Sequence, residues 1–222
     1  RGMTIQDSHE EIPGRMRQRL GRSAENAVAG RAEIDAVLAR RAQGPRPALD
    51  ADLIARFRAR SDALGSTVEI VARREEAPGA AARYLAAHDL PRAAVAWTQL
   101  AGLDWAGADL RVEARSANGD DLVGITGVFC AVAETGTLVL LSGPDTPAAS
   151  SLLPETHIAI VPAARIVAGM EEAWALLRAE AGELPRAVNF ISGPSRTGDI
   201  EQTLVLGAHG PYRVHIVLVA EK

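Results

Sequence analysis

Cysteine is almost absent from this chain of 222 residues. Cys130 is the single cysteine, so the chain can form no disulfide within itself and no cysteine-ligated zinc or iron–sulfur site. Its neighbours in GVFCAVAE are apolar, which favours a buried structural thiol over a nucleophile. The five histidines lack the pairwise spacing of metal ligands. We therefore predict no metal and no cofactor in this chain.

Excess positive charge and long apolar runs are also missing. The formal net charge is -4, and Lys222 is the only lysine, with no Lys/Arg-rich block elsewhere. Nucleic-acid binding needs a basic face, so we expect no nucleic-acid partner. No segment approaches the roughly 20 apolar residues of a membrane helix, and the first residues lack the apolar core of a signal peptide. These features predict a soluble, cytoplasmic protein without a membrane span.

Helical patterns dominate the first third of the chain. Apolar residues recur at helical spacing over residues 23–41 and again over about 50–64, with a proline-rich break between them. We predict an N-terminal helical arm over residues 1–65. Its apolar stripes need cover, either from the rest of the chain or from a second copy in a homodimer. The stripes comprise Val28, Ile34, Leu38, Leu53, Ile54 and Phe57.

Short β-branched runs alternate with helical segments after residue 66. Several of the apolar runs are continuous, as in strands that are buried on both faces. Residues 66–222 therefore predict one α/β domain, a three-layer α/β/α sandwich around a mixed, mostly parallel sheet. The exception to the parallel pattern is AVAETGTLVLLS, where two apolar runs flank a turn with Gly136 at positive φ.

Two polar segments could carry chemistry. The first is the turn Glu134-Thr135-Gly136-Thr137, which is either a solvated hairpin tip or a site where Glu134 acts as acid, base or nucleophile. The second is the loop SGPSRTG, residues 192–198, which we place between a strand and a helix over DIEQTLVLG. At a helix start, free N–H groups and the dipole favour an anion.

The SGPSRTG loop has the side chains of an anion cradle. Gly193 permits close approach of the backbone, and Arg196 can grip a carboxylate or phosphate with two parallel hydrogen bonds. The hydroxyl donors are Ser192, Ser195 and Thr197, and Asp199 and Glu201 would orient the loop or a donor group of the ligand. The alternative is a simple helix cap by Thr197 or Asp199. In GAHGPYR, His209 and Gly210 form a glycine-rich bend that is either structural or part of the ligand site.

Three segments together resemble the lactate utilization protein C family, the stand-alone LUD-domain proteins of bacteria. They are GVFCAVAETGTLVLLSGP, SLLPETHIAIVPAARIV and ISGPSRTGDIEQTLVLGAHGPYRVHIVLV. The resemblance covers about residues 66–220, and the family usually has alanine where Gly198 stands. It implies a fold like that of the sugar-phosphate isomerase and CoA-transferase group. It also implies a part in L-lactate use beside two iron–sulfur subunits. The matching positions are Glu134–Thr137, Leu153, Pro154, His157, Ser192–Thr197, Asp199–Glu201, Gly207 and His209–Pro211.

Two functions are compatible with these observations. In the first, the chain is an accessory or ligand-binding subunit that holds a small anion, while iron–sulfur clusters reside in partner subunits. In the second, it is a stand-alone acyl or CoA transferase or isomerase, with Glu134 or Glu201 as the catalytic carboxylate. Thioester exchange by the purified chain, abolished by Glu134→Gln, would favour the second.

Overall fold

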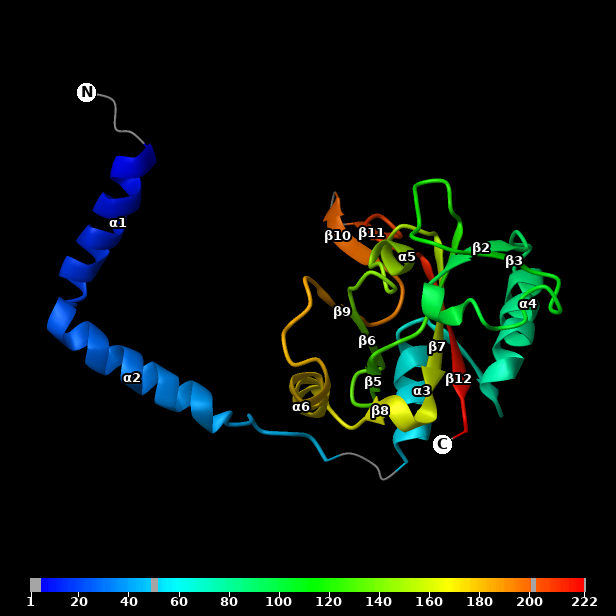
Figure 1. Ribbon diagram of the computed structural model, residues 1–222, viewed down its shortest axis with the longest axis horizontal. Helices are drawn as coiled ribbons and strands as arrows, with labels where there is room; N and C mark the ends of the chain where they lie inside the picture. Colours follow the sequence, from blue (N-terminus) through cyan, green and yellow to red (C-terminus); the bar gives the residue numbers. More distant parts are fainter. Residues whose placement is uncertain (1–4, 49–51, 201–202, 222) are drawn as a thin grey trace. The chain divides into compact units, whose positions relative to one another are not determined.

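The computed structural model describes residues 5–48, 52–200 and 203–221. The chain divides into two units, Arg1–Pro47 and Ala48–Lys222 (Figure 1). The first unit holds α1 (Ile5–Arg19) and α2 (Ala24–Arg40). Ser23 and Asn26 form a reciprocal capping box at the start of α2, which explains why the helix begins there. The second unit begins before the boundary that the sequence pattern suggested, because Phe57 of α3 is buried in its core.

The main sheet of the second unit has six strands, and every pair is parallel. Their order is β1-β12-β7-β4-β2-β3. The central strands are buried on both faces, as their continuous apolar runs predict. The bounds are β1 Thr67–Val71, β12 Arg213–Val219, β7 Thr156–Pro162, β4 Val123–Thr126, β2 Ala93–Ala96 and β3 Arg111–Ala114.

The predicted antiparallel pair lies in a second sheet, of order β8-β5-β6-β9, and not in the main one. A separate two-stranded ribbon, β10-β11, follows β9. The bounds are β8 Ile166–Val167, β5 Cys130–Val132, β6 Thr137–Leu141, β9 Val188–Ile191, β10 Arg196–Ile200 and β11 Thr203–Leu206.

Helices cover both faces of the main sheet. Tyr84 of α4 (Ala77–Ala87) stacks on His215 of β12, with ring centroids 4.1 Å apart. Gly124 of β4 faces α5 (Ala149–Leu152), and the register places Gly124 level with His157 and Val214. Because neighbouring residues of a strand point to opposite faces, α4 and α5 lie on opposite sides. This is the predicted α/β architecture.

The two remaining helices both pack against the second sheet, and α3 also packs against the first. Helix α3 (Leu53–Ala63) contacts β1 of the main sheet and β8 of the second. Helix α6 (Met170–Glu180) covers the second sheet, with Ala173 packed among Cys130, Val132 and Val139. Figure 1 shows α6 and α4 on opposite sides of the unit, with both sheets between them.

Candidate functional site

The predicted turn at residues 134–137 joins β5 to β6 in an antiparallel hairpin, which confirms the sequence prediction. Gly136 has φ +66° and its N–H donates to Val132 O over 3.0 Å. A Cβ at Gly136 would lie 2.7 Å from Ser61 N and 2.9 Å from the carbonyl carbon of Arg60. The turn therefore needs glycine both for its conformation and for its close packing on the last turn of α3.

The helix predicted over residues 199–207 is wrong. Residues Arg196–Ile200 form β10 and Thr203–Leu206 form β11, which pair antiparallel. Gly198 and the β-branched Thr203 lower the helix propensity of this segment, and the ladder satisfies its backbone groups instead. The described residues that follow the loop, 196–200 and 203–206, are strands, so they offer no helix dipole to draw an anion there. Glu201 lies outside the described residues, as does the side chain of Asp199, so their roles stay predictions.

A chain of hydroxyl groups connects the two predicted segments. Thr137 Oγ1 lies 2.7 Å from Thr135 Oγ1 on one side and 2.7 Å from Ser192 Oγ on the other. Thr137 is buried, Thr135 is half-buried and Ser192 is exposed. Three hydroxyls carry three protons, and the two hydrogen bonds between them use two. One proton is therefore left over, and the hydroxyl that carries it depends on which way the two hydrogen bonds run.

The loop before β10 closes against the end of α3. Gly193 has φ +79°, and a Cβ there would lie 2.8 Å from Leu64 O. The same carbonyl accepts a 2.7 Å hydrogen bond from Nη2 of Arg196. An arginine at a helix carboxyl end compensates the negative end of the dipole, an effect of about 0.3–1 kcal/mol. Arg196 thus has a structural role as a cap of α3, while its side chain remains exposed.

The bend at residues 207–211 packs behind this loop. The N–H of Ser195 donates to Pro211 O over 2.8 Å, and Ser195 O accepts from the N–H of Gly207 over 2.9 Å. A Cβ added at Gly210 would lie 3.5 Å from the Cβ of Ser195. His209 is exposed in this bend. The bend therefore holds Ser195 in place.

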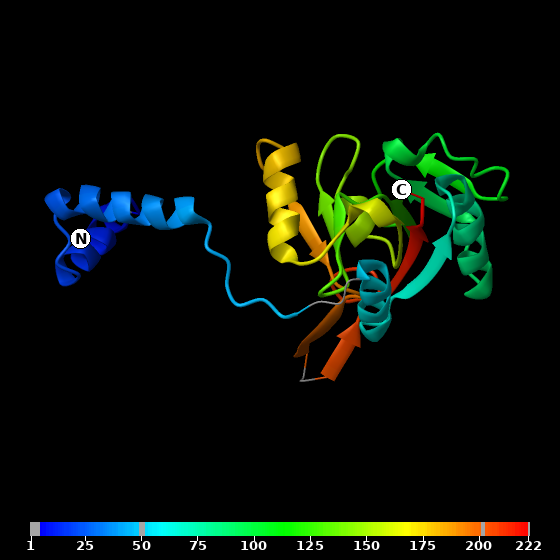
Figure 2. The ribbon, with the colours of Figure 1, turned by 90° about the horizontal axis from the view of Figure 1, so that it is seen from below.

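We call residues 60–65, 134–137 and 192–197 the α3 junction. Figure 2 shows the β10–β11 ribbon leaving the second unit beside α3, with the junction at its base. The junction places the hydroxyl chain, which joins the turn after Glu134 to Ser192, beside the loop that holds Arg196 and Thr197, so the two candidate segments lie side by side. Glu134 is half-buried, and its N–H donates to Ala168 O over 3.0 Å. Asp199 and Glu201 are not placed in it.

Two buried histidines lie outside the junction. His157 is fully buried in β7, and its Nε2 lies 2.8 Å from Thr126 Oγ1. His215 lies in β12 with its Nδ1 2.8 Å from Thr67 Oγ1. Burial lowers the pKa of His157 to about 4, and burial together with the charge of His88 lowers the pKa of His215 to about 4. Both rings are therefore neutral at pH 7, which explains how the core accommodates them.

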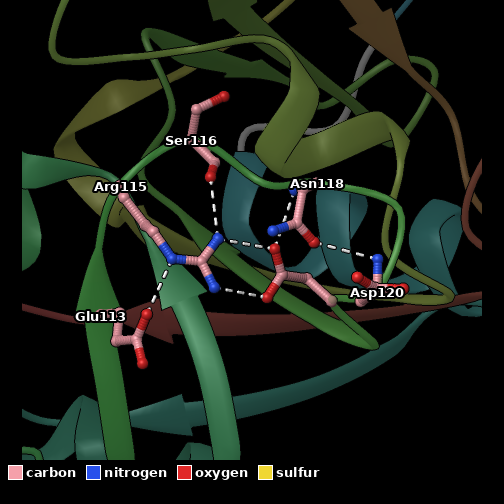
Figure 3. A network of polar contacts seen from close by, with 6 residues as sticks. Glu113, Arg115, Ser116, Asn118 and Asp120 are labelled. Atoms are coloured by element: carbon pink, nitrogen blue, oxygen red, sulfur yellow. Dashed lines mark hydrogen bonds and ion pairs between the residues drawn. The ribbon is translucent and has the colours of Figure 1, made fainter.

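A charged network, not anticipated from the sequence, orders the loop after β3 (Figure 3). Arg115 donates two hydrogen bonds to Asp121, of 2.7 and 2.8 Å, and one of 2.8 Å to Glu113. The guanidinium holds the pKa of the Asp121 carboxyl below its usual value. Asp121 also accepts from the N–H of Asn118, so the network ties the loop to itself. Its residues pair with one another, which indicates a structural role.

The described part of the chain offers neither a metal-binding cluster nor a membrane-spanning helix. Residues 5–48, 52–200 and 203–221 contain no group of three or more His, Cys, Asp or Glu side chains able to hold a metal ion. Over the same ranges, no helix has the length and apolarity to cross a membrane. Cys130 is buried, and burial raises the pKa of its thiol to about 11, as expected of a structural thiol.

Known proteins resemble this chain in both sequence and fold. Residues 54–219 match the family model described as LUD domain. Lactate utilization protein C of Bacillus subtilis (strain 168) is 44% identical over 103 residues, which are 45% of this chain and 43% of that protein. The protein of the same name from Exiguobacterium sp. is 39% identical over 141 residues, 62% of this chain and 61% of the relative. The chain thus spans about half the length of the curated relatives it matches.

A solved structure shares the fold. The crystal structure of a DUF162 family protein from Deinococcus radiodurans aligns with a TM-score of 0.57 and 27% sequence identity. The alignment covers 78% of this chain and all of the other, 100%.

Proposed function

Because the chain belongs to the LUD domain family, we propose that it takes part in bacterial lactate utilization, the process named in its relatives. In this proposal it is an accessory, ligand-binding subunit that works with iron–sulfur proteins in the oxidation of lactate to pyruvate. The observation that carries the proposal is the match of residues 54–219, a stretch that contains the whole α3 junction.

The cysteine content supports an accessory role in which this chain binds a ligand and does not carry an iron–sulfur cluster. Oxidation of lactate releases two electrons, and a cysteine-ligated cluster that accepts them needs several thiolates. Cys130 is the single cysteine of the chain, and its buried thiol has a pKa raised to about 11. Any such cluster in this process would therefore lie outside these 222 residues.

The α3 junction is the proposed site for a small anionic ligand. Nη2 of Arg196 donates a hydrogen bond to Leu64 O, and the exposed guanidinium carries further N–H donors. The hydroxyl chain ends near the same loop at the exposed Ser192, whose hydroxyl donates to a ligand when it accepts its hydrogen bond from Thr137. A carboxylate or phosphate that bridges these groups would bind without a helix dipole. We expect a weak, salt-sensitive site, because the charge is exposed.

Binding of an anion at the junction can be tested with one pair of variants. In thermal-shift titrations of the full chain, lactate, pyruvate and phosphate should raise the melting temperature of the parent. They should not raise that of Arg196→Gln. The control is Arg186→Gln, which removes an exposed arginine from the loop before β9. An equal shift in the parent and in Arg196→Gln would refute the role of Arg196.

The competing function is a stand-alone acyl or CoA transferase or isomerase. Glu134 favours it, because a half-buried carboxylate next to the hydroxyl chain could act as a nucleophile or base. Thioester exchange between CoA donors and small acids, measured with the purified chain, separates the two functions. Turnover that Glu134→Gln abolishes would replace the accessory role with an enzymatic one.

A further inference from the structure

Five of the six strands of the main sheet end at one cavity of about 160 Å³. All strands of this sheet run parallel, so their carboxyl ends share one edge. In open α/β sheets, ligands bind at this edge. The cavity shares no residue with the α3 junction. It is lined by Arg74 after β1, Gln99 and Leu100 after β2, Gly127 and Val128 after β4, Ile160 and Pro162 of β7, and Val219 and Glu221 at the end of β12.

The cavity has an apolar floor and a charged rim. Leu100, Ile160 and Val219 are buried and form the floor. Arg74 and Glu221 are exposed at the rim. A ligand that fits this arrangement places an aliphatic group inward and its polar groups outward.

Backbone contacts hold both charged groups of the rim. Nη2 of Arg74 donates to Gln99 O over 3.2 Å, and the N–H of Arg74 donates to Oε1 of Glu221 over 3.0 Å. The N–H of Glu221 donates in turn to Ala72 O over 3.0 Å. A guanidinium has five N–H donors and a carboxylate has about four acceptor positions, so each group keeps capacity for a ligand. A cation and an anion are thus fixed at the mouth of one small cavity.

We propose that this sheet-edge cavity binds a small aliphatic carboxylic acid that carries a hydrogen-bond donor beside the carboxyl group, that is, a 2-hydroxy or 2-amino acid. The carboxylate pairs with Arg74, the hydroxyl or ammonium group donates to Glu221, and the aliphatic part covers Ile160 and Val219. Pockets that enclose drug-sized ligands measure about 300–1,000 Å³, so a cavity of about 160 Å³ selects a short acid over a nucleotide or CoA.

Titration calorimetry of the full chain tests this site with three acids of similar size. L-Lactate and L-alanine carry the donor, and pyruvate lacks it. We expect L-lactate or L-alanine to bind with a dissociation constant of about 10 mM or lower. Pyruvate should bind with a higher dissociation constant. Arg74→Gln should weaken binding about tenfold or more, since it removes a charged hydrogen bond. Glu221→Ala should abolish the preference over pyruvate.

Two controls locate the effect. Arg73→Gln removes the neighbouring exposed arginine, which pairs with Glu76 and does not line the cavity, and it should leave binding unchanged. Amide NMR shifts on addition of the acid should concentrate at Gly127, Val128 and Glu221. Absence of binding by both donor-bearing acids overturns the proposal. Binding that Arg196→Gln weakens and Arg74→Gln does not would assign these acids to the α3 junction instead.

Discussion

Acidification from pH 7 to pH 5 should destabilise the protein strongly, because two histidines are buried as neutral rings. The pKa of His157 and of His215 falls from the ordinary 6.5 to about 4 in the folded chain. The unfolded chain therefore binds protons as the pH drops through 6.5, whereas the folded chain does so only near 4. Their stabilising contribution is complete above pH 6.5 and is lost as the pH falls toward 4.

The size of the effect follows from the two pKa values. Each histidine contributes a loss of about 2 kcal/mol between pH 7 and pH 5, and the two together about 4 kcal/mol. Near pH 5.5, the free energy of unfolding should fall by about 2.4 kcal/mol for each pH unit. The combined loss of about 4 kcal/mol is a large part of the free energy of unfolding of typical domains, which is about 5–15 kcal/mol.

Urea unfolding at fixed temperature and at several pH values measures this slope. His157→Gln and His215→Gln should each remove about half of it, whatever they do to the stability at pH 7. His209→Gln, in an exposed bend, is the matched control and should keep the full slope. A flat profile between pH 6.5 and pH 5, or an unchanged slope in both core variants, would show that protonation of these two histidines does not control the stability.

Three further predictions concern packing, association and charge. Gly193→Ala should destabilise the chain by about 1–3 kcal/mol in urea unfolding, because a Cβ would lie 2.8 Å from a carbonyl at the end of α3. Gly182→Ala, also at positive φ but with open space, should cost only about 1 kcal/mol. The exposed apolar face of α2, on which Ile34 is 54% exposed, predicts a homodimer through this helix. Ile34→Asp should then convert the dimer to a monomer in sedimentation. A parent chain that is itself monomeric would contradict the prediction. Arg115→Gln should raise the pKa of Asp121 in an NMR titration, because it removes the hydrogen bonds that lower it; an unmoved pKa contradicts this.

Local patterns predicted the elements whose stability is local. The hairpin around Gly136 follows from two apolar runs and one flexible residue, and α6 follows from its helical apolar spacing. The β10–β11 ribbon was missed, because apolar residues in a short segment suit a helix face as well as a strand, and the pairing of the two neighbouring strands decided between them. Helix α1 was not identified, since it contains Pro13, which disfavours a helix interior, and its composition is polar.

The candidate site could be predicted only in its parts. Both halves of the α3 junction were found from clustered glycine and hydroxyl residues. Their common support, the last turn of α3, was not, because the contact of Leu64 with Arg196 spans more than a hundred residues of sequence. The sheet-edge cavity was missed for the same reason. Its lining comes from five separate segments, and none of them carries a distinctive motif.

We propose that this chain supports lactate oxidation without performing the electron transfer itself. The most direct test of this proposal is lactate-dependent reduction of an electron-accepting dye by the purified iron–sulfur subunits of the host's lactate oxidation system, with and without this chain. We expect no turnover by the chain alone, little by the partner subunits alone and full activity when they are combined. Full activity of the partner subunits in the absence of the chain, or lactate oxidation by the chain alone, would contradict it.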